Sequence, residues 1–122
     1  MNLRADQRGA SKVAVVESDR VLIQDTQDAL DLMATVRYQV EADKLILFKQ
    51  NLVESFFDLS TRLAGDILQK YTNYSMIIAI VGDFSTYSSK SFKDFIYECN
   101  NGKHVFFLPD EQTALEKLHS LS

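Results

Sequence analysis

The run Met76–Val81 constrains the fold more than any other part of the sequence, because every one of its side chains is apolar. A strand with one face in water alternates apolar and polar residues, whereas a strand covered on both faces is apolar throughout. Strands of the second kind are typical of parallel sheets that carry helices. The run is also far shorter than the roughly 20 residues of a membrane-spanning helix. The sequence therefore indicates an α/β fold built around a buried strand.

The other segments alternate between strand and helix patterns. Further runs of apolar or β-branched residues have the length of strands: Val13–Val16, Val21–Ile23, Leu45–Phe48 and Val105–Leu108. Segments with apolar residues at helical spacing follow residues that can cap a helix: Asp25, Asp58 or Ser60, Ser88 or Ser89, and Asp110. The resulting order, ββαβαβαβα, predicts an α/β fold with one mixed five-stranded sheet, in which the later strands are parallel and helices cover the sheet.

The chain of 122 residues fits a single domain. We expect residues 1–12 to be a flexible N-terminal arm, since Gly9, Ala10 and Ser11 stand among charged residues without an apolar period. Residues 13–122 then form one α/β domain. Its first two strands predict a β-hairpin that turns in the polar residues 17–20. The segment 50–60 shows neither the helical nor the strand period.

Composition and missing motifs exclude several classes of protein. The 13 basic and 17 acidic residues give a net charge of −4, which argues against a nonspecific nucleic-acid binder. The single cysteine, Cys99, excludes an internal disulfide framework and predicts a reducing, cytoplasmic setting. The start of the chain has no apolar signal core, and we expect no membrane partner. Because glycine-rich phosphate loops and a nucleophile elbow are absent, we predict no catalytic residue, no metal and no cofactor.

A small set of polar residues is expected at the carboxyl ends of the strands, where α/β sheets bind ligands. The set comprises Asp25, Lys49, Ser60, Asp83 and Asp110. One interpretation is a small-ligand or enzymatic site around Asp25, Lys49 and Asp83. The other, which we favour, is that Asp25, Ser60 and Asp110 cap helices and that Asp83 belongs to an ordinary turn after Gly82.

Aromatic residues in irregular segments suggest an interaction surface. Phe56 and Phe57 lie in the segment without a period, and Phe84 and Tyr87 follow the turn after the central strand. Exposed aromatic residues favour binding to another protein or to a second copy of the chain. We therefore expect Phe56 and Phe57 to contribute to a surface for a protein partner, and a homodimeric scaffold is one alternative.

The residues that most often act as nucleophiles and bases have plainer interpretations here. Cys99 falls on the apolar stripe of its predicted helix, which favours a packing role over a reactive thiol. His104 stands at the start of a predicted strand and His119 at the end of a predicted helix. We expect both histidines at the surface.

Several segments closely resemble a bacterial family catalogued as a domain of unknown function, number 4180. They are "VLIQDTQDALDLMATVRY", "FFDLSTRLAGDILQKYTNY", "IAIVGDFSTYSSKSFKDFIYE" and "HVFF". The resemblance spans Val13 to Leu118. It implies no activity, cofactor or catalytic residue.

From Leu45 onward, the order of elements also resembles the STAS domain of anti-sigma factor antagonists. The segment "FDLSTRLAGDILQKYTNYSMIIAIVG" is similar to the turn, helix and strand of that domain, and "EQTALEKL" is similar to its last helix. On this resemblance, Asp58 matches the aspartate of an Asp-Ser-Ser-Gly-like turn and Ser60 matches the phosphorylated serine. Leu59 stands where a serine is usual, and Thr61 replaces the glycine.

A phosphate on Ser60 also has a physical basis, because a helix N-terminus favours an anion. It would add about −1.5 to −2 charges, which Arg62 would favour and Asp58 and Asp66 would oppose. The alternative is that Ser60 only caps a helix. Our leading hypothesis is a non-catalytic, cytoplasmic regulatory or protein-interaction domain with a STAS-like fold, switched by phosphorylation near Ser60, with Thr61 and Asp58 in the same turn.

Overall fold

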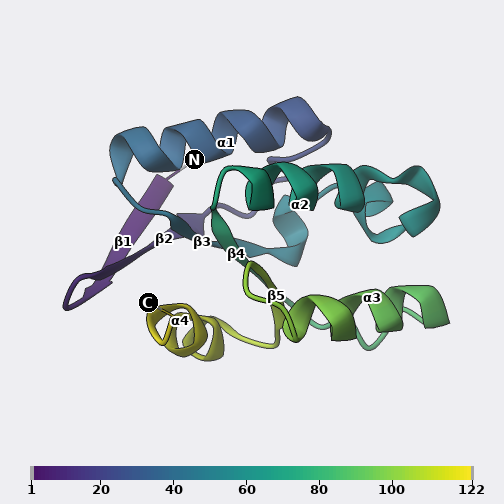
Figure 1. The fold of residues 1–122 in the computed structure, drawn as a ribbon. Coiled ribbons are helices and arrows are strands. Elements are labelled where there is room, and N and C mark those ends of the chain that lie inside the picture. Colours follow the sequence, from purple (N-terminus) through teal and green to yellow (C-terminus); the bar gives the residue numbers. More distant parts are fainter. Residues whose placement is uncertain (1, 122) are drawn as a thin grey trace.

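A mixed sheet with helices on both faces forms the body of the protein (Figure 1). The structure is a computed structural model, and it describes residues 2–121. The strands are β1 (Asn2–Arg8), β2 (Ser11–Glu17), β3 (Lys44–Phe48), β4 (Ile77–Val81) and β5 (Val105–Leu108). The helices are α1 (Thr26–Gln39), α2 (Leu63–Asn73), α3 (Lys90–Asn100) and α4 (Glu111–His119). This confirms the mixed α/β domain with five strands and four helices.

The strands follow one another across the sheet in the order β1-β2-β3-β4-β5. Strand β1 is antiparallel to β2, and each later pair is parallel. Each parallel pair needs a crossover connection, and α1, α2 and α3 provide these connections. The carboxyl ends of β2 to β5 therefore point to the same edge of the sheet.

Strand β4 is buried on both faces, as its apolar run predicts. Ile78 and Ile80 point into a large apolar cluster that includes residues of α1, α2 and α3. Ala79 and Val81 point into a second cluster on the opposite face, which contains the apolar residues of α4. The apolar run therefore reflects a sheet with helices on both sides.

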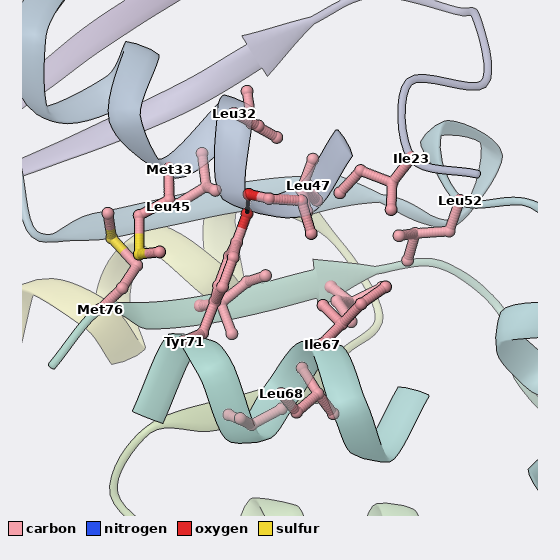
Figure 2. Close-up of a cluster of buried hydrophobic side chains, with 14 of the residues drawn as sticks. Ile23, Leu32, Met33, Leu45, Leu47, Leu52, Ile67, Leu68, Tyr71 and Met76 are labelled. Atoms are coloured by element: carbon pink, nitrogen blue, oxygen red, sulfur yellow. Dashed lines mark hydrogen bonds between the residues drawn. The ribbon is translucent and has the colours of Figure 1, made fainter. Parts of the chain in front are cut away.

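The larger cluster is held together by one polar contact as well as by packing (Figure 2). Tyr71 reaches from α2 toward α1, and its hydroxyl donates a hydrogen bond to the Ala29 carbonyl oxygen at 2.6 Å. Burial raises the pKa of Tyr71 well above its ordinary value. The hydroxyl therefore stays protonated and joins the two helices within the cluster that also contains Leu45 and Met76.

The prediction of a flexible arm at residues 1–12 is wrong, because residues 2–8 form β1. A two-residue turn at Gly9 and Ala10 joins β1 to β2, with Arg8 paired to Ser11. Gly9 has a φ of 60°, which favours glycine and is common in such turns. Leu3 packs against the larger cluster, so β1 also gains apolar contacts.

The predicted hairpin between residues 13–16 and 21–23 is also wrong. Strand β2 pairs with β1 and β3, while Ile23 makes only an isolated parallel bridge to Leu52. The backbone N–H groups of Leu22 and Ile23 both donate to the Asn51 carbonyl oxygen, at 2.8 and 3.0 Å. The segment therefore lies against residues 51–53 rather than in the sheet.

The segment 49–61, which has no regular period, forms three short 3-10 turns. They span Lys49–Asn51, Glu54–Phe57 and Leu59–Thr61. The Asn51 side chain is fully buried and holds this segment to residues 18–20. Its Oδ1 accepts from the Phe48 N–H at 2.9 Å, and its Nδ2 donates to the Ser18 and Arg20 carbonyl oxygens, each at 2.9 Å. One amide therefore fixes the backbone beyond the end of β3.

Candidate functional site

A groove of about 650 Å³ lies beyond the carboxyl ends of β3 and β4. We call it the strand-end groove. Lys49 and Glu54 line it from the segment that follows β3, and Gly82 and Asp83 line it from the turn that follows β4. Val21 is half-exposed there and adds apolar surface. The groove has the position that ligands take in parallel α/β sheets.

The structure brings Lys49 and Asp83 together, as the site interpretation predicts. The Lys49 Nζ donates to the backbone oxygen of Asp83 at 2.9 Å. The same ammonium lies 4.7 Å from the ring centroid of Tyr87 and 5.9 Å from that of Phe84. A cation over an aromatic face is attracted by the ring quadrupole. Lys49 is thus fixed by a carbonyl oxygen and two rings.

Asp25 does not line this groove. It is the N-cap of α1, where its Oδ1 accepts from the Asp28 N–H at 2.8 Å. Asp110 caps α4 in the same way, through a 2.7 Å bond from the Thr113 N–H, which lowers the pKa of Asp110. These two residues have the capping roles that the sequence predicts.

The Asp83 carboxylate serves its own turn. Its Oδ1 accepts from the Ser85 hydroxyl at 2.6 Å and from the Ser85 N–H at 2.9 Å. The hydroxyl, followed by the N–H, lowers the pKa of Asp83. The carboxylate is therefore charged and exposed, and it closes the turn that also carries Phe84.

The prediction that Phe56 and Phe57 form an interaction surface is wrong, since only 1% and 5% of these residues are exposed. The 3-10 turn at Glu54–Phe57 directs both rings into the larger apolar cluster. Phe57 stacks on Tyr87, with centroids 5.4 Å apart, and meets Phe92 edge-on at 6.0 Å. Packing between aromatic rings thus replaces the exposed surface.

A second groove, of about 360 Å³, is lined by Tyr87 and by residues of the segment that follows β3. We call it the aromatic groove. Phe57, Leu59 and Phe92 form its apolar floor, while Glu54 and Asp58 contribute exposed carboxylates. Glu54 lines both grooves.

Tyr87 and Glu54 form a contact that sequence reasoning did not predict. The Tyr87 hydroxyl donates to Glu54 Oε1 at 3.0 Å. Burial is the main cause that raises the pKa of Tyr87 to about 12, and the Glu54 carboxylate adds to it. The two residues are 33 positions apart in the sequence, with Glu54 in the segment after β3 and Tyr87 in the connection between β4 and α3. No local period signals such a contact.

Ser60 and Asp58 form a small exposed turn. Asp58 Oδ1 accepts from the Ser60 hydroxyl at 2.7 Å and from the Ser60 N–H at 3.0 Å, and both bonds lower the pKa of Asp58. The prediction that Asp58 or Ser60 caps the second helix is wrong. Helix α2 starts at Leu63, after Arg62, whose φ of 63° separates the turn from the helix.

Thr61 is the residue of this segment whose hydroxyl meets α2. Its Oγ1 accepts from the Leu63 N–H at 3.2 Å and lies 2.8 Å from the carbonyl oxygens of Ser55 and Asp58. The Thr61 hydroxyl is therefore fully engaged. The Ser60 hydroxyl, by contrast, is exposed and bonded to one carboxylate oxygen.

A separate polar cluster lies near the first hairpin. The His119 ring is hydrogen-bonded at both nitrogens. Its Nδ1 lies 2.8 Å from Ser11 Oγ, and its Nε2 lies 2.7 Å from Asp6 Oδ1. Since a carboxylate only accepts, Nε2 donates the hydrogen bond to Asp6. The Lys44 Nζ also donates to Ser11 Oγ at 2.9 Å. This saturated network ties α4 to the hairpin.

The prediction that His119 lies at the surface is wrong, because only 5% of its side chain is exposed. Its buried position follows from the strand β1, which the sequence did not reveal and which brings Asp6 to the ring. The half-buried thiol of Cys99 packs against the larger cluster, and burial raises its pKa to about 11. A protonated thiol in this position fits the predicted packing role.

Within residues 2–121, no helix combines the length and the apolar composition that crossing a membrane requires. No curated protein and no solved structure is detectably similar to the chain. The family described as Domain of unknown function (DUF4180) matches residues 8–118, which cover nearly the whole of the domain seen here. The match includes both grooves and the turn at Ser60. The chain belongs to this family, Domain of unknown function (DUF4180).

Proposed function

We propose that the protein is a non-catalytic regulatory domain with a STAS-like fold, and that it acts by binding another protein through the aromatic groove and the adjacent Ser60 turn. One observation carries the proposal. The exposed Ser60 hydroxyl is bonded to Asp58, which itself lines the groove. A change of charge at Ser60 therefore acts directly on the groove.

Phosphorylation of Ser60 supplies such a change. It adds about −1.5 to −2 charges and strong acceptor oxygens. Phosphorylation replaces the hydroxyl proton that Ser60 donates to Asp58, so this hydrogen bond is lost, and the negative phosphate repels the carboxylate. The 3-10 turn at Leu59–Thr61 then loses one of the bonds that hold it. Binding and turn geometry change together, without any chemistry by the domain itself.

We place this function in the reducing interior of a bacterial cell. The free thiol of Cys99, the single cysteine of the sequence, supports this location. A protein partner is favoured over a nucleic acid because the net charge is −4. A homodimer is a further arrangement of the same domain, although Phe56 and Phe57 are buried and do not contribute to it.

A phosphorylation experiment tests the proposal. The purified protein is incubated with bacterial extract and ATP, and modified residues are mapped by mass spectrometry. We expect a phosphate on Ser60 in the wild type and none on this residue in Ser60→Ala. Ser91→Ala changes another exposed serine, on α3, and serves as the matched control.

Partner binding is then compared among the wild type, Ser60→Ala and Ser60→Asp. We expect Ser60→Asp to differ from Ser60→Ala in the proteins that it retains, and Ser91→Ala to match the wild type. If neither Ser60 nor Thr61 carries a phosphate and the Ser60 variants retain the same proteins equally, the proposal fails.

A second candidate function, binding of a small ligand in the strand-end groove, rests on the juxtaposition of Lys49, Gly82 and Asp83. A panel of phosphates, carboxylates and nucleotides is screened for a rise in melting temperature. A compound that stabilises the wild type but not Lys49→Ala supports this function. If no compound separates the two proteins, the strand-end groove is not a site for these ligands.

A further inference from the structure

The two edges of the sheet differ in how they are closed. At the β5 edge, the Asn100 side chain pairs with the backbone of Phe107, whose N–H donates to Oδ1 at 2.7 Å and whose carbonyl oxygen accepts from Nδ2 at 3.2 Å. Strand β5 is also only four residues long. Strand β1 forms the opposite edge with seven residues, and no strand of residues 2–121 pairs with its outer side (Figure 1).

The turn between β1 and β2 determines which backbone groups of β1 face outward. Arg8 and Ser11 flank this turn and are paired, and the residues that flank a two-residue turn exchange hydrogen bonds. Bonded and non-bonded pairs then alternate along an antiparallel ladder. The residues that direct their N–H and C=O groups away from β2 are therefore Leu3, Ala5 and Gln7. A row of such unpaired groups is a template for a further strand.

The side chains of β1 make this edge complementary to itself. Arg4 and Asp6 lie on the same face of the strand, and 37% and 27% of their side chains are exposed. When two copies pair in antiparallel fashion with Ala5 opposite Ala5 of the second copy, each Arg4 lies opposite an Asp6. The outward-facing backbone groups are in phase in the same register, since Leu3 then lies opposite Gln7.

Charge disfavours the neighbouring registers. The registers that keep the hydrogen bonds in phase differ by two residues. A shift in one direction places Arg4 opposite Arg4 of the second copy. A shift in the other direction places Asp6 opposite Asp6 and Arg4 opposite Arg8. Like charges directly opposite each other destabilise an antiparallel pair, whereas opposite charges stabilise it. One register is therefore selected.

The contacts within each copy leave polar atoms for the pairing across the edge. His119 Nε2 and Arg8 Nε approach Asp6 at Oδ1, which leaves Oδ2 as an acceptor. Arg4 contacts Glu17 through Nε and Glu111 through Nη2, which leaves Nη1 as a donor. The same contacts hold both side chains at the edge before a second copy arrives.

We propose that β1 is a dimerisation strand, through which two copies of the chain pair in antiparallel fashion about a twofold axis at Ala5. The two five-stranded sheets then form one continuous sheet. Such an interface uses the same surface of both copies and is closed. The Asn100 side chain blocks the β5 edges, so the sheet does not grow beyond the dimer. The inference goes beyond the proposed function, because it involves neither Ser60 nor the aromatic groove.

Sedimentation velocity of the full chain, from micromolar to millimolar concentrations, tests the proposal. We expect the wild type to form a dimer. Ala5→Pro removes an outward N–H from each copy, and an edge strand tolerates proline where the N–H faces solvent. We expect this variant to dimerise roughly tenfold more weakly, or less, because two hydrogen bonds are lost. Ala5→Ser keeps the N–H and serves as the matched control.

A pair of charge variants tests the symmetry of the interface. Ala5 is exposed and lies opposite itself in the proposed dimer, so Ala5→Lys alone and Ala5→Glu alone each place like charges together. We expect each variant to dimerise several-fold more weakly than the wild type, and an equimolar mixture of the two to regain the dimer. Gln69→Lys and Gln69→Glu, at an exposed position on α2, should dimerise like the wild type alone and mixed.

Three results would overturn the proposal. They are a wild type that stays monomeric, a dimer that persists in Ala5→Pro, and a mixture of the two Ala5 charge variants that dimerises no better than either alone. A monomeric wild type leaves the β1 edge to a strand of another protein. Ser60→Ala should dimerise like the wild type, so failure of the phosphorylation switch and failure of the dimer are distinguishable.

Discussion

Gly82 and Lys49 approach each other so closely that a Cβ atom at Gly82 would lie 2.7 Å from the Cβ of Lys49. Carbon atoms at that separation overlap, so one of the two backbones must move when any side chain is added. The close approach occurs where the ends of β3 and β4 meet, in the wall of the strand-end groove. Glycine at this position therefore allows the end of β3 and the turn after β4 to lie this close together.

We expect Gly82→Ala to lower the free energy of unfolding by about 1–3 kcal/mol, which is the usual cost of overpacking. Urea denaturation measures the effect. Gly65→Ala is the matched control, because a Cβ at Gly65 in α2 meets nothing within 4 Å and alanine favours helices. A Gly82→Ala protein as stable as Gly65→Ala would contradict the close packing of the groove wall.

Asn51 is the residue whose loss should disturb the segment 49–61 most. We expect Asn51→Ala to cost about 1–3 kcal/mol, because the Phe48 N–H and the Ser18 and Arg20 carbonyl oxygens lose a buried partner. The exposed neighbour provides the control, and Gln50→Ala should change stability little. Urea denaturation gives both values. Hydrogen exchange adds a local measure, since the Phe48 amide should exchange faster in Asn51→Ala alone.

Asp110 should make the stability of the protein depend on acid pH. The Thr113 N–H lowers the pKa of Asp110 in the folded state, so the unfolded state binds a proton more readily. Stability from this group is therefore present above the pKa of the unfolded state and is lost as the pH falls through the folded pKa. Asp110→Asn keeps a capping side chain but cannot titrate. We expect the urea midpoint to fall less steeply with decreasing pH in Asp110→Asn than in the wild type. If the midpoints of the two proteins fall in parallel as the pH decreases, Asp110 does not have this role.

Cys99 should react slowly with thiol reagents. Burial raises its pKa to about 11, so little thiolate is present at neutral pH. We expect the folded protein to be alkylated by iodoacetamide much more slowly than the protein unfolded in urea, and the ratio to shrink as the pH is raised. Equal alkylation rates for the folded and the unfolded protein at neutral pH would contradict the packing of the Cys99 thiol against the larger apolar cluster.

The parts of the fold that sequence reasoning predicts well are those with a strong local period. The run at Met76–Val81 has no polar position, and it predicts the buried β4 because no exposed strand tolerates that pattern. Asp25 and Asp110 stand directly before apolar helical spacing, and both cap helices as expected. These features depend on contacts between near neighbours, so the sequence alone carries the signal.

Strand β1 and the candidate site depend instead on distant contacts. In β1, only Leu3 packs against the core, while its other residues are polar or small, so the strand has almost no apolar signal. The turn at Gly9 and Ala10 was the available clue. Glu54 lies in one of three short turns after β3 and meets Tyr87 from the segment after β4, and no spacing rule predicts this contact.

The network that joins α4 to the first hairpin has a consequence for biosynthesis. Arg4 pairs with Glu111 and Asp6 with His119, so β1 gains these partners only after α4, which follows every strand of the sheet, has been made. Until α4 is made, the face that carries Val15, Ile46 and Phe106 has no cover. A nascent chain that has not yet reached α4 therefore exposes an apolar face of the sheet, which is the kind of surface that promotes aggregation.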